Sequence, residues 1–423
     1  MRKTMMVWSA CAAAVLPALA ASTAVADGVP NQDVGQAAIS SQSATSAATS
    51  TQRNPTNQAI NVAILSPGAA SGAVSQSNSS AAQSAAGNAN STAQGAAQSG
   101  GAGGGGGVQA IGQGAASEQT ADSTATSTQS NPTNQAINVA ILSPGASSGA
   151  VSQSNDSAAN SAAGNANGTK QDAVQSGGGS GGGVQAIGQQ ADNEQEADST
   201  ATSTQSGATN QAIGVAILSP GASSGAVSQS NSSDADSTAG NANETKQDAD
   251  QSGGDGHPMK PQPKDGCESC HPSYPTVQGI GQAAYNDQSA TSTATSTQAN
   301  PTNTAIQVSI LSPGAYGGPV SQSNSSKADS MAGNRNETTQ HAAQLGGGRG
   351  GVQAIGQLAT NAQSALSSAT STQWCPTNLA VGTKGGVRQS NDSSADSAAG
   401  NDNRTKQDAL QTLAGFRWPV VVM

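Results

Sequence analysis

The side chains best suited to chemistry gather in one short segment, residues 256–275. Cys267, Cys270 and His271 spell Cys-x-x-Cys-His, the attachment pattern of a c-type haem. In such a site the two thiols bond the vinyl groups and His271 is the proximal ligand. His257 or Met259 would then supply the distal ligand. The segment is therefore a candidate haem site.

Two other interpretations fit the same residues. His257, Cys267, Cys270 and His271 are also ligand types that Zn²⁺ prefers. Alternatively, the two cysteines close a small disulfide in an exposed loop that binds nothing. A chain with so few large apolar residues offers no ordinary haem pocket, so we expect no cofactor, with haem c or a metal as the alternatives.

No catalytic constellation recurs along the chain. The histidines are His257, His271 and His341, and two of them belong to the segment just described. Acidic residues vary from repeat to repeat, so no general acid–base pair is maintained. Cys375 is a further thiol that could pair with the segment or between chains, or be a chance substitution. We therefore expect a protein that is not an enzyme.

The segment interrupts an array of long repeats. Val-Gln-Ala-Ile-Gly begins at residues 108, 184 and 352, and its variant Val-Gln-Gly-Ile-Gly begins at residue 277. A fixed period of this kind is typical of repeat architectures. The predicted organisation is a signal peptide (1–26), repeat 1 (27–107), repeat 2 (108–183), repeat 3 (184–276, with the insert at 253–276), repeat 4 (277–351) and a degenerate repeat 5 with an apolar tail (352–423).

Residues 123–145 show what each repeat is made of. Thr124, Thr126 and Thr128 alternate with small residues, and Ile137 shares a face with the next two alternate positions, as in a strand. Asn-Pro-Thr-Asn interrupts the run and predicts a tight arch, because proline cannot donate to a sheet. Ser-Pro-Gly predicts the turn that ends the second strand.

Glutamine and asparagine dominate the rest of the repeat. Identical amides stacked in register about 4.7 Å apart hydrogen-bond along the stack. Within repeat 2, Gln113, Gln129, Gln153 and Gln171 are spaced as corners of successive coils, which predicts three to four coils per repeat. The fold class expected is all-β, a β-solenoid or stacked β-arches in about five long repeats joined by Gly-rich linkers, with disordered segments.

One pattern resembles a known family. Gln205, Gly207, Asn210 and Ala212 match Gln-x-Gly-x-x-Asn-x-Ala, the core of the curlin repeat of curli amyloid fibre subunits. The other copies keep Gln, Asn and Ala but not the glycine: Gln52, Asn57, Ala59; Gln129, Asn134, Ala136; Gln298, Asn303, Ala305; Gln373, Asn378, Ala380. The resemblance implies self-association through strand edges, with these Gln and Asn residues supplying the ladders.

Composition and the first residues bear on location and partners. Arg2 and Lys3, the apolar residues 5–19 and the small residues 24–26 have the order of a secretory signal peptide. Net charge −10 and a pI near 4.6 argue against nucleic acid and anionic lipid as partners. Aromatic content of 2% excludes a large ordinary core, which leaves a thin solenoid or a disordered spacer. We expect an exported protein without an integral membrane span in the mature chain.

Three functions follow as expectations. The first is a secreted, cell-surface or biofilm-matrix fibre protein, a functional amyloid whose partners are copies of itself or other surface proteins. The second is a secreted haem c redox protein. The third is a binding module for ice or another surface, built from the threonine runs at 124–128, 200–204 and 293–297. Because each long repeat has one such run, we expect the threonine rows to lie too far apart for that third role. The apolar residues 413–423 are expected to cover the last coil or to dock on a surface.

Overall fold

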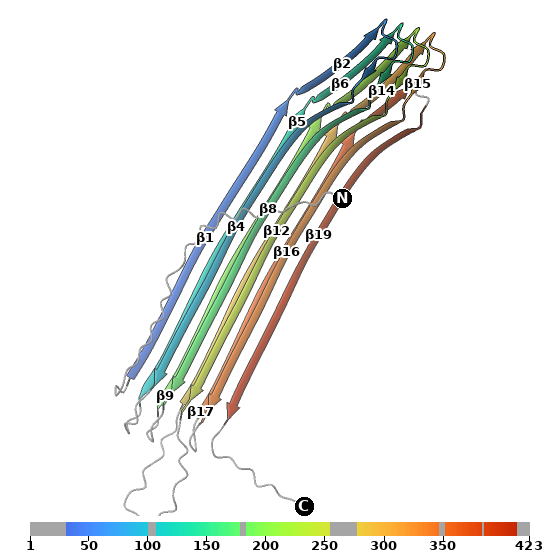
Figure 1. Cartoon of the computed structure of the whole chain (residues 1–423). Helices are drawn as coiled ribbons and strands as arrows, with labels where there is room; N and C mark the ends of the chain where they lie inside the picture. The colour runs from blue at the N-terminus through green and yellow to red at the C-terminus, as the bar shows by residue number, and fades with distance from the viewer. Residues whose placement is uncertain are drawn as a thin grey trace, which may run out of the picture.

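The computed structural model describes residues 31–99, 107–177, 183–253, 277–346, 352–382 and 385–412. These residues form strands, bends and turns, and no helix occurs among them. Each repeat makes a single long coil, here called a rung, and five rungs lie side by side (Figure 1). The all-β, solenoid-like repeat fold expected from the sequence is confirmed.

A complete rung has four strands in a fixed order: a long outbound strand, a nine-residue extension, a two-residue strand and a long return strand. The outbound strands are β1 (Asn31–Arg53), β5 (Val108–Ser130), β9 (Val184–Ser206), β13 (Val277–Ala299) and β17 (Val352–Trp374). The extensions are β2 (Thr56–Ile64), β6 (Thr133–Ile141), β10 (Thr209–Ile217), β14 (Thr302–Ile310) and the shorter β18 (Thr377–Val381). The short strands are β3 (Ala70–Ser71), β7 (Ser147–Ser148), β11 (Ser223–Ser224) and β15 (Tyr316–Gly317). The return strands are β4 (Val74–Ser99), β8 (Val151–Ser176), β12 (Val227–Ser252), β16 (Val320–Leu345) and β19 (Val387–Thr412).

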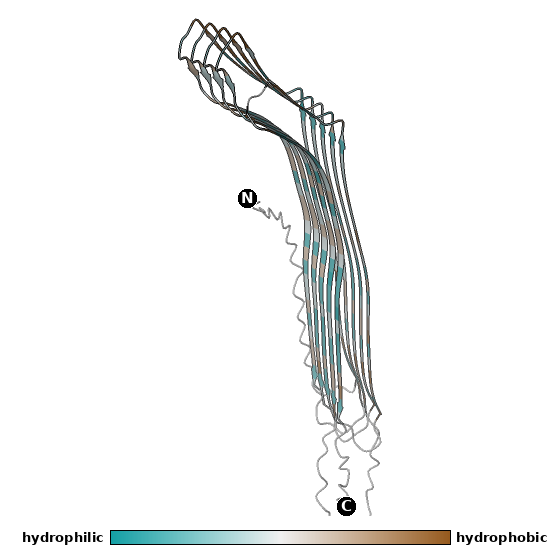
Figure 2. Ribbon diagram, turned by 90° about the vertical axis from the view of Figure 1, so that its right-hand side faces the viewer, coloured by the Kyte–Doolittle hydropathy of each residue, from teal (hydrophilic) through white to brown (hydrophobic). Residues whose placement is uncertain are grey.

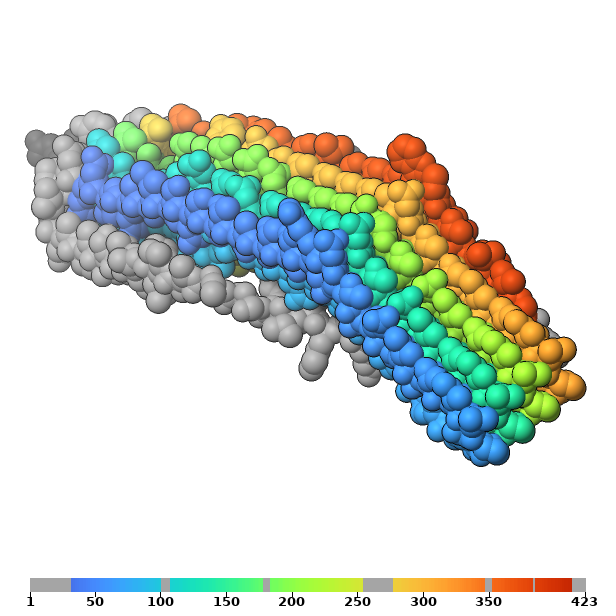
Figure 3. All heavy atoms as spheres, turned by 90° about the horizontal axis from the view of Figure 1, so that it is seen from above, coloured from blue at the N-terminus to red at the C-terminus, as the bar shows by residue number. Residues whose placement is uncertain are grey.

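Equivalent strands of successive repeats pair in parallel and in register. They form sheet A (outbound strands), sheet B (extensions), sheet C (short strands) and sheet D (return strands). For example, Gln52 pairs with Gln129, and Gln129 pairs with Gln205. The rungs are therefore adjacent strands in every sheet, as the parallel coloured bands of Figure 3 show.

The predicted three to four coils per repeat are wrong, because each repeat supplies only one. The outbound strand has 23 residues and the return strand 26, so the two strands consume most of a repeat. Gln113 and Gln129 lie on the same straight strand β5, and Gln153 and Gln171 both lie on β8. The glutamine spacing marks positions along these strands and not corners between coils.

The Asn-Pro sequence makes a kink and not the predicted arch. Asn131 has φ 49° and Pro132 follows, yet the chain runs on in the same direction into β6. Before the kink Ser127 bonds Ser157, and after it Asn134 bonds Asn155, so both segments lie along β8. The ribbon bends at this point (Figure 2). A left-handed residue shifts the alternation of the strand without reversing it, and proline needs no ladder partner.

The reversal comes at the predicted Ser-Pro-Gly turn. Leu142 with φ 51° and Gly145 with φ 69° turn the chain after β6, and β7 leads back into β8. In the fifth rung the described chain passes from β18 to β19 without a two-residue strand, so sheet C has only four strands. The last rung is thus shorter at this tip than the other four.

Sheets A and D face each other across a thin core of small and amide side chains. Alanines from both sheets pack together, among them Ala125, Ala159 and Ala201, each 0% exposed. A band of larger residues, with Ile111 and Ile187 at its centre, lies near the end of the rung away from the tip. Small side chains let the two sheets approach closely, and the long amides between them must find hydrogen-bond partners inside.

Candidate functional site: ladders, outer faces and edges

The five glutamines of the curlin-like pattern form one continuous ladder. Gln129 donates from Nε2 to Oε1 of Gln52 over 2.8 Å, and Gln205 donates to Gln129 over 2.8 Å. Gln298 and Gln373 extend the ladder with bonds of 2.8 and 2.7 Å. Gln129, Gln205 and Gln298 are each 0% exposed. Every internal glutamine therefore both donates to and accepts from an identical neighbour.

The five asparagines form a second ladder that is tied to sheet D. Asn57, Asn134, Asn210 and Asn303 each donate from Nδ2 to Oδ1 of the next asparagine, over 2.9 Å, and Asn378 accepts the last bond. Each asparagine also donates across the core to an asparagine of a return strand. These cross bonds measure 2.9–3.0 Å and join Asn57 to Asn78, Asn134 to Asn155, Asn210 to Asn231, Asn303 to Asn324 and Asn378 to Asn391. The pattern thus joins two sheets as well as successive rungs.

The stacked amides expected throughout the repeat occur in most of the core, although the individual ladder residues outside the curlin-like pattern were not identified from the sequence. On sheet D a glutamine ladder runs through Gln76, Gln153, Gln229, Gln322 and Gln389. A further one runs through Gln94, Gln171, Gln247, Gln340 and Gln407. The signal for these ladders is the recurrence of the same amide at equivalent positions of all five repeats.

Threonines cover part of the outer face of sheet A. In each rung they alternate with inward-facing residues, such as the buried Ala125 and Ser127 of the second rung, and they align between rungs. The prediction that these rows lie too far apart is wrong, because successive repeats are neighbouring strands, about 4.8 Å apart. The array consists of Thr49, Thr51, Thr124, Thr126, Thr128, Thr200, Thr202, Thr204, Thr293, Thr295, Thr297, Thr370 and Thr372.

The outer face of sheet B is apolar, which sequence reasoning did not predict. Ile60, Val62 and Ile64 of the first rung are 57%, 56% and 55% exposed. Isoleucine or valine stands at the equivalent positions of the next three rungs, and Val381 continues the first column in the fifth. The alternation that the sequence shows is real, but its apolar side faces outward.

Charge is concentrated on the middle of the stack. The third rung, residues 184–252, carries nine carboxylates against one lysine. Asp192, Glu194, Glu196 and Asp198 follow one another on the outer face of β9. Partial desolvation of its exposed carboxyl raises the pKa of Glu196, and the charges of Asp198, Asp122 and Glu194 add to the effect. By contrast, the first rung has only Asp33 and Arg53.

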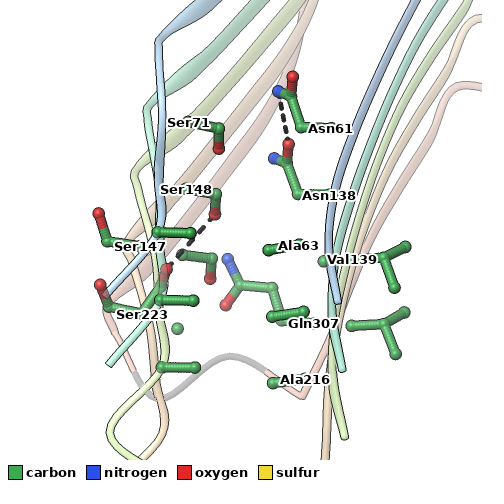
Figure 4. Close-up of a pocket in the computed structure, with 18 of the residues that line it drawn as sticks. Asn61, Ala63, Ser71, Asn138, Val139, Ser147, Ser148, Ala216, Ser223 and Gln307 are labelled. Carbon is green, nitrogen blue, oxygen red and sulfur yellow. Dashed lines mark hydrogen bonds between the residues drawn. The ribbon is translucent and has the colours of Figure 1, made fainter. Parts of the chain in front are cut away.

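A cavity of about 400 Å³ lies at the tip, between the inner faces of sheets B and C. Asn61 donates to Asn138 over 2.9 Å, but the next residue in this column is Gly214, which ends the ladder. Gln307 follows and points its amide into the space, as Figure 4 shows. Among the described residues, neither amide atom of Gln307 has a hydrogen-bond partner. A buried amide in a polar cavity of this size is suited to bind water.

The two end rungs expose sheet edges. Strands β1 and β4 have a neighbour on one side only, and so do β17 and β19. The inward-facing residues of these rungs are the same types that the central rungs use: Gln52 and Gln373 in one ladder, Gln76 and Gln389 in another. Within the described ranges no segment covers either edge. The degeneration of the fifth repeat affects its tip and leaves its ladders complete.

Several predicted sites lie outside the described residues. They are the insert with His257, Met259, Cys267, Cys270 and His271, the signal peptide and the apolar residues 413–423. The haem, zinc and disulfide interpretations therefore stay predictions. Cys375 is described; it is exposed, at the kink position of the fifth rung with φ 48°.

Comparison with known proteins gives no relative: no family model, curated protein or solved structure shows a significant match to the chain. In the part of the chain that the structure describes, no helix has the length and apolar character needed to cross a membrane.

Proposed function

We propose that this is an exported structural protein that polymerises end to end, the fifth rung of one copy stacking on the first rung of the next. The fibre would continue the amide ladders from copy to copy, as the resemblance to curlin repeats suggests, at a cell surface or in an extracellular matrix. In-register parallel strands with stacked amides are the arrangement of cross-β fibres.

The observation that carries the proposal is the lack of caps among the described residues. Solenoids that remain single usually end in polar capping repeats, and sheet edges are usually blocked by charge, proline or a covering segment. Here the end rungs keep the inward Gln, Asn, Ser and Ala columns of the interior. A stacked copy would therefore meet a chemically matching edge in both facing sheets.

The distribution of charge supports the same contact. In an in-register parallel stack each residue faces its equivalent, so charges of one sign repel between rungs. The fifth rung has four basic and four acidic residues, and the first rung has one of each. The strongly acidic third rung lies inside, two rungs from either edge. The rungs that would meet are those with the least electrostatic repulsion.

The contact can be tested by placing charges on outer positions that only end-to-end stacking brings together. Ala47 and Ser368 occupy one outer column of sheet A, and Ala85 and Ala398 occupy one of sheet D. With lysine at all four positions, two pairs of like charges face each other across the contact between copies. Each pair costs about 1 kcal/mol in water. Growth, followed by thioflavin fluorescence and light scattering, should slow by roughly tenfold or more.

A matched variant gives the control. With lysine at Ala47 and Ala85 but glutamate at Ser368 and Ala398, the facing charges are opposite and growth should match or exceed that of the unchanged protein. Fibre diffraction should show the 4.7–4.8 Å spacing of stacked strands. If both charge sets slow growth equally, or if mature protein stays monomeric at micromolar concentration, the proposal is wrong.

A second function is favoured by one observation, the threonine array on sheet A. We infer that it could bind an ordered surface such as ice, because its rows repeat about every 4.8 Å across strands and about 6.7 Å along them. Each threonine offers a methyl group and a hydroxyl on a flat face. Thermal hysteresis of dilute monomer, lost when Thr126 and Thr202 are replaced by tyrosine, tests this function. No hysteresis in the unchanged protein would rule it out.

A further inference from the structure

The outward face of sheet B, here called the apolar face, carries three columns of β-branched residues. The columns begin at Ile60, Val62 and Ile64 and run across the rungs at 4.8 Å intervals. The remaining members are Ile137, Val139, Ile141, Ile213, Val215, Ile217, Ile306, Val308, Ile310 and Val381. Leu65 and Leu311, next to the columns, are 70% and 73% exposed. A contiguous exposed face of this kind marks an interaction site.

Within the described ranges no segment of the chain covers this face. The undescribed residues between rungs, and residues 413–423 after β19, leave the sheets at the end opposite the tip. Sheet B begins beyond the 23 residues of the outbound strand, about 75 Å from that end. Residues 413–423 extend to about 40 Å at most, and so does a loop made from residues 254–276. Neither can reach the apolar face of its own copy.

We propose that the apolar face is covered by the same face of a second copy, and that this lateral pairing joins fibres and not single molecules. The inference rests on the proposed end-to-end polymerisation. Flat faces of alternating β-branched side chains interdigitate when two sheets stack about 10 Å apart. Isoleucine and valine columns are self-complementary, because a two-fold axis places the same residues on both sides.

The area of the apolar face indicates whether pairing occurs between single copies or only between fibres. Four strands with three outward positions each, and Val381 on the fifth, at spacings of about 4.8 Å and 6.7 Å, give roughly 400 Å² per copy. Two faces together bury about 800 Å², which is below the 1,200–2,000 Å² of a stable specific interface. End-to-end stacking aligns the faces into one long stripe, in which two of the three columns skip the fifth rung of each copy, so the buried area grows with every copy added. Pairing should therefore follow polymerisation.

A polar border limits the face on its side toward the kink. Gln58 donates to Gln135 over 2.9 Å, and Gln135 donates to Gln211 over 2.9 Å, all on the outer side of sheet B. These amides satisfy one another along the stack and remain partly exposed. An apolar centre with a polar rim is the usual composition of a protein interface.

The experiment compares fibres of three proteins by electron microscopy. The test variant carries Val139→Lys and Val215→Lys, in the centre of the apolar face on the second and third rungs. The matched control carries Thr126→Lys and Thr202→Lys, on the same rungs but on the outer face of sheet A. Unchanged protein and control should give paired filaments. The test variant should elongate normally, with paired segments reduced about tenfold or more, because lysine would be buried at every pairing.

Each outcome bears on the proposal. Single filaments of unchanged protein would overturn the lateral pairing but leave end-to-end polymerisation standing. Dimers of dilute unchanged protein in sedimentation velocity, without fibres, would overturn the area argument and the polymerisation together. Pairing that persists in the test variant would also overturn the assignment of the face. Should the lysine variant not fold by circular dichroism, Val139→Thr with Val215→Thr keeps the strand propensity and is expected to weaken pairing in the same direction.

Discussion

Replacing one buried amide tests whether the ladders hold the rungs together. Asn134 is 0% exposed and donates to the Ser154 carbonyl over 2.8 Å, to Asn155 over 3.0 Å and to Asn210 over 2.9 Å. Its own Oδ1 accepts from Asn57 over 2.9 Å. Asn134→Ala removes all these bonds in the middle of the core. The adjacent residue Gln135 is the natural control, because it makes a ladder of the same chemistry on the outer face of the same strand.

The expected difference follows from which groups water can reach. Asn134→Ala removes several buried hydrogen bonds whose net contribution is about 0.5–1.5 kcal/mol each, although Asn57, Asn155 and Asn210 keep other partners, so we expect a loss of about 2–4 kcal/mol in unfolding free energy. After Gln135→Ala the amides of Gln58 and Gln211 are hydrated instead, so we expect about 0.5 kcal/mol. The loss in unfolding free energy for Asn378→Ala should fall between these two values, since Asn378 lies on an end rung and has a ladder neighbour on one side only.

Denaturant unfolding of dilute monomer, followed by circular dichroism in the β region, gives the two free energies from midpoint and slope. The proteins must share the same slope for the comparison to concern stability alone. Equal losses for Asn134→Ala and Gln135→Ala would refute the reasoning. They would mean that the backbone ladders and alanine packing hold the stack and that the buried amides merely fill space.

Three further predictions can be checked with the same unfolding assay. Gly225→Ala should lower the free energy of unfolding by about 2 kcal/mol or more, because a Cβ there would lie 2.6 Å from the carbonyl carbon of Gly149 in the preceding rung. At Gly112 an added Cβ meets nothing within 4 Å, so Gly112→Ala should be neutral. Equal effects of the two substitutions would contradict the close approach at Gly225. Leu142→Gly should gain roughly 0.5–1 kcal/mol, because φ of 51° strains any residue with a Cβ, and Leu142→Ala should gain nothing. Asp234→Asn should stabilise at neutral pH, because burial raises the pKa of this carboxyl and its charged form therefore destabilises the fold. That gain should shrink as pH falls through the folded-state pKa and disappear below the unfolded-state value, and a gain independent of pH would show that charge is not its cause.

The sequence allowed the type of fold to be predicted but not the size of its repeating unit. β-Branched alternation, amide-rich composition and the recurrence of Val-Gln-Ala-Ile-Gly are local features, and they indicated parallel stacked strands. The coil count failed because strands of 23 and 26 residues are far longer than ordinary strands, so ordinary lengths gave too many turns. The Asn-Pro arch failed for a related reason: a left-handed residue and a proline interrupt a strand, but only packing against β8 shows that the chain runs straight on.

Some features of the candidate site could be predicted from the sequence, and others could not. The ladder residues Gln129 and Asn134 could be identified because identical residues at equivalent positions must meet when repeats stack in register. Their bonds across the core to sheet D could not, because they depend on how outbound and return strands face each other. The direction of the Ile137 face was equally hidden, since alternation defines two faces without saying which one is buried.

The sequence by itself determined that the chain repeats, that it forms strands, and that amides and small residues supply its core. These properties follow from residue type and spacing, which act over a few residues at a time. Only the tertiary structure decided that one repeat is one rung, that the threonine rows are neighbours, and that the isoleucine columns face outward. Those features depend on which strands pair and which faces meet, and pairing joins residues that lie 67 to 93 positions apart.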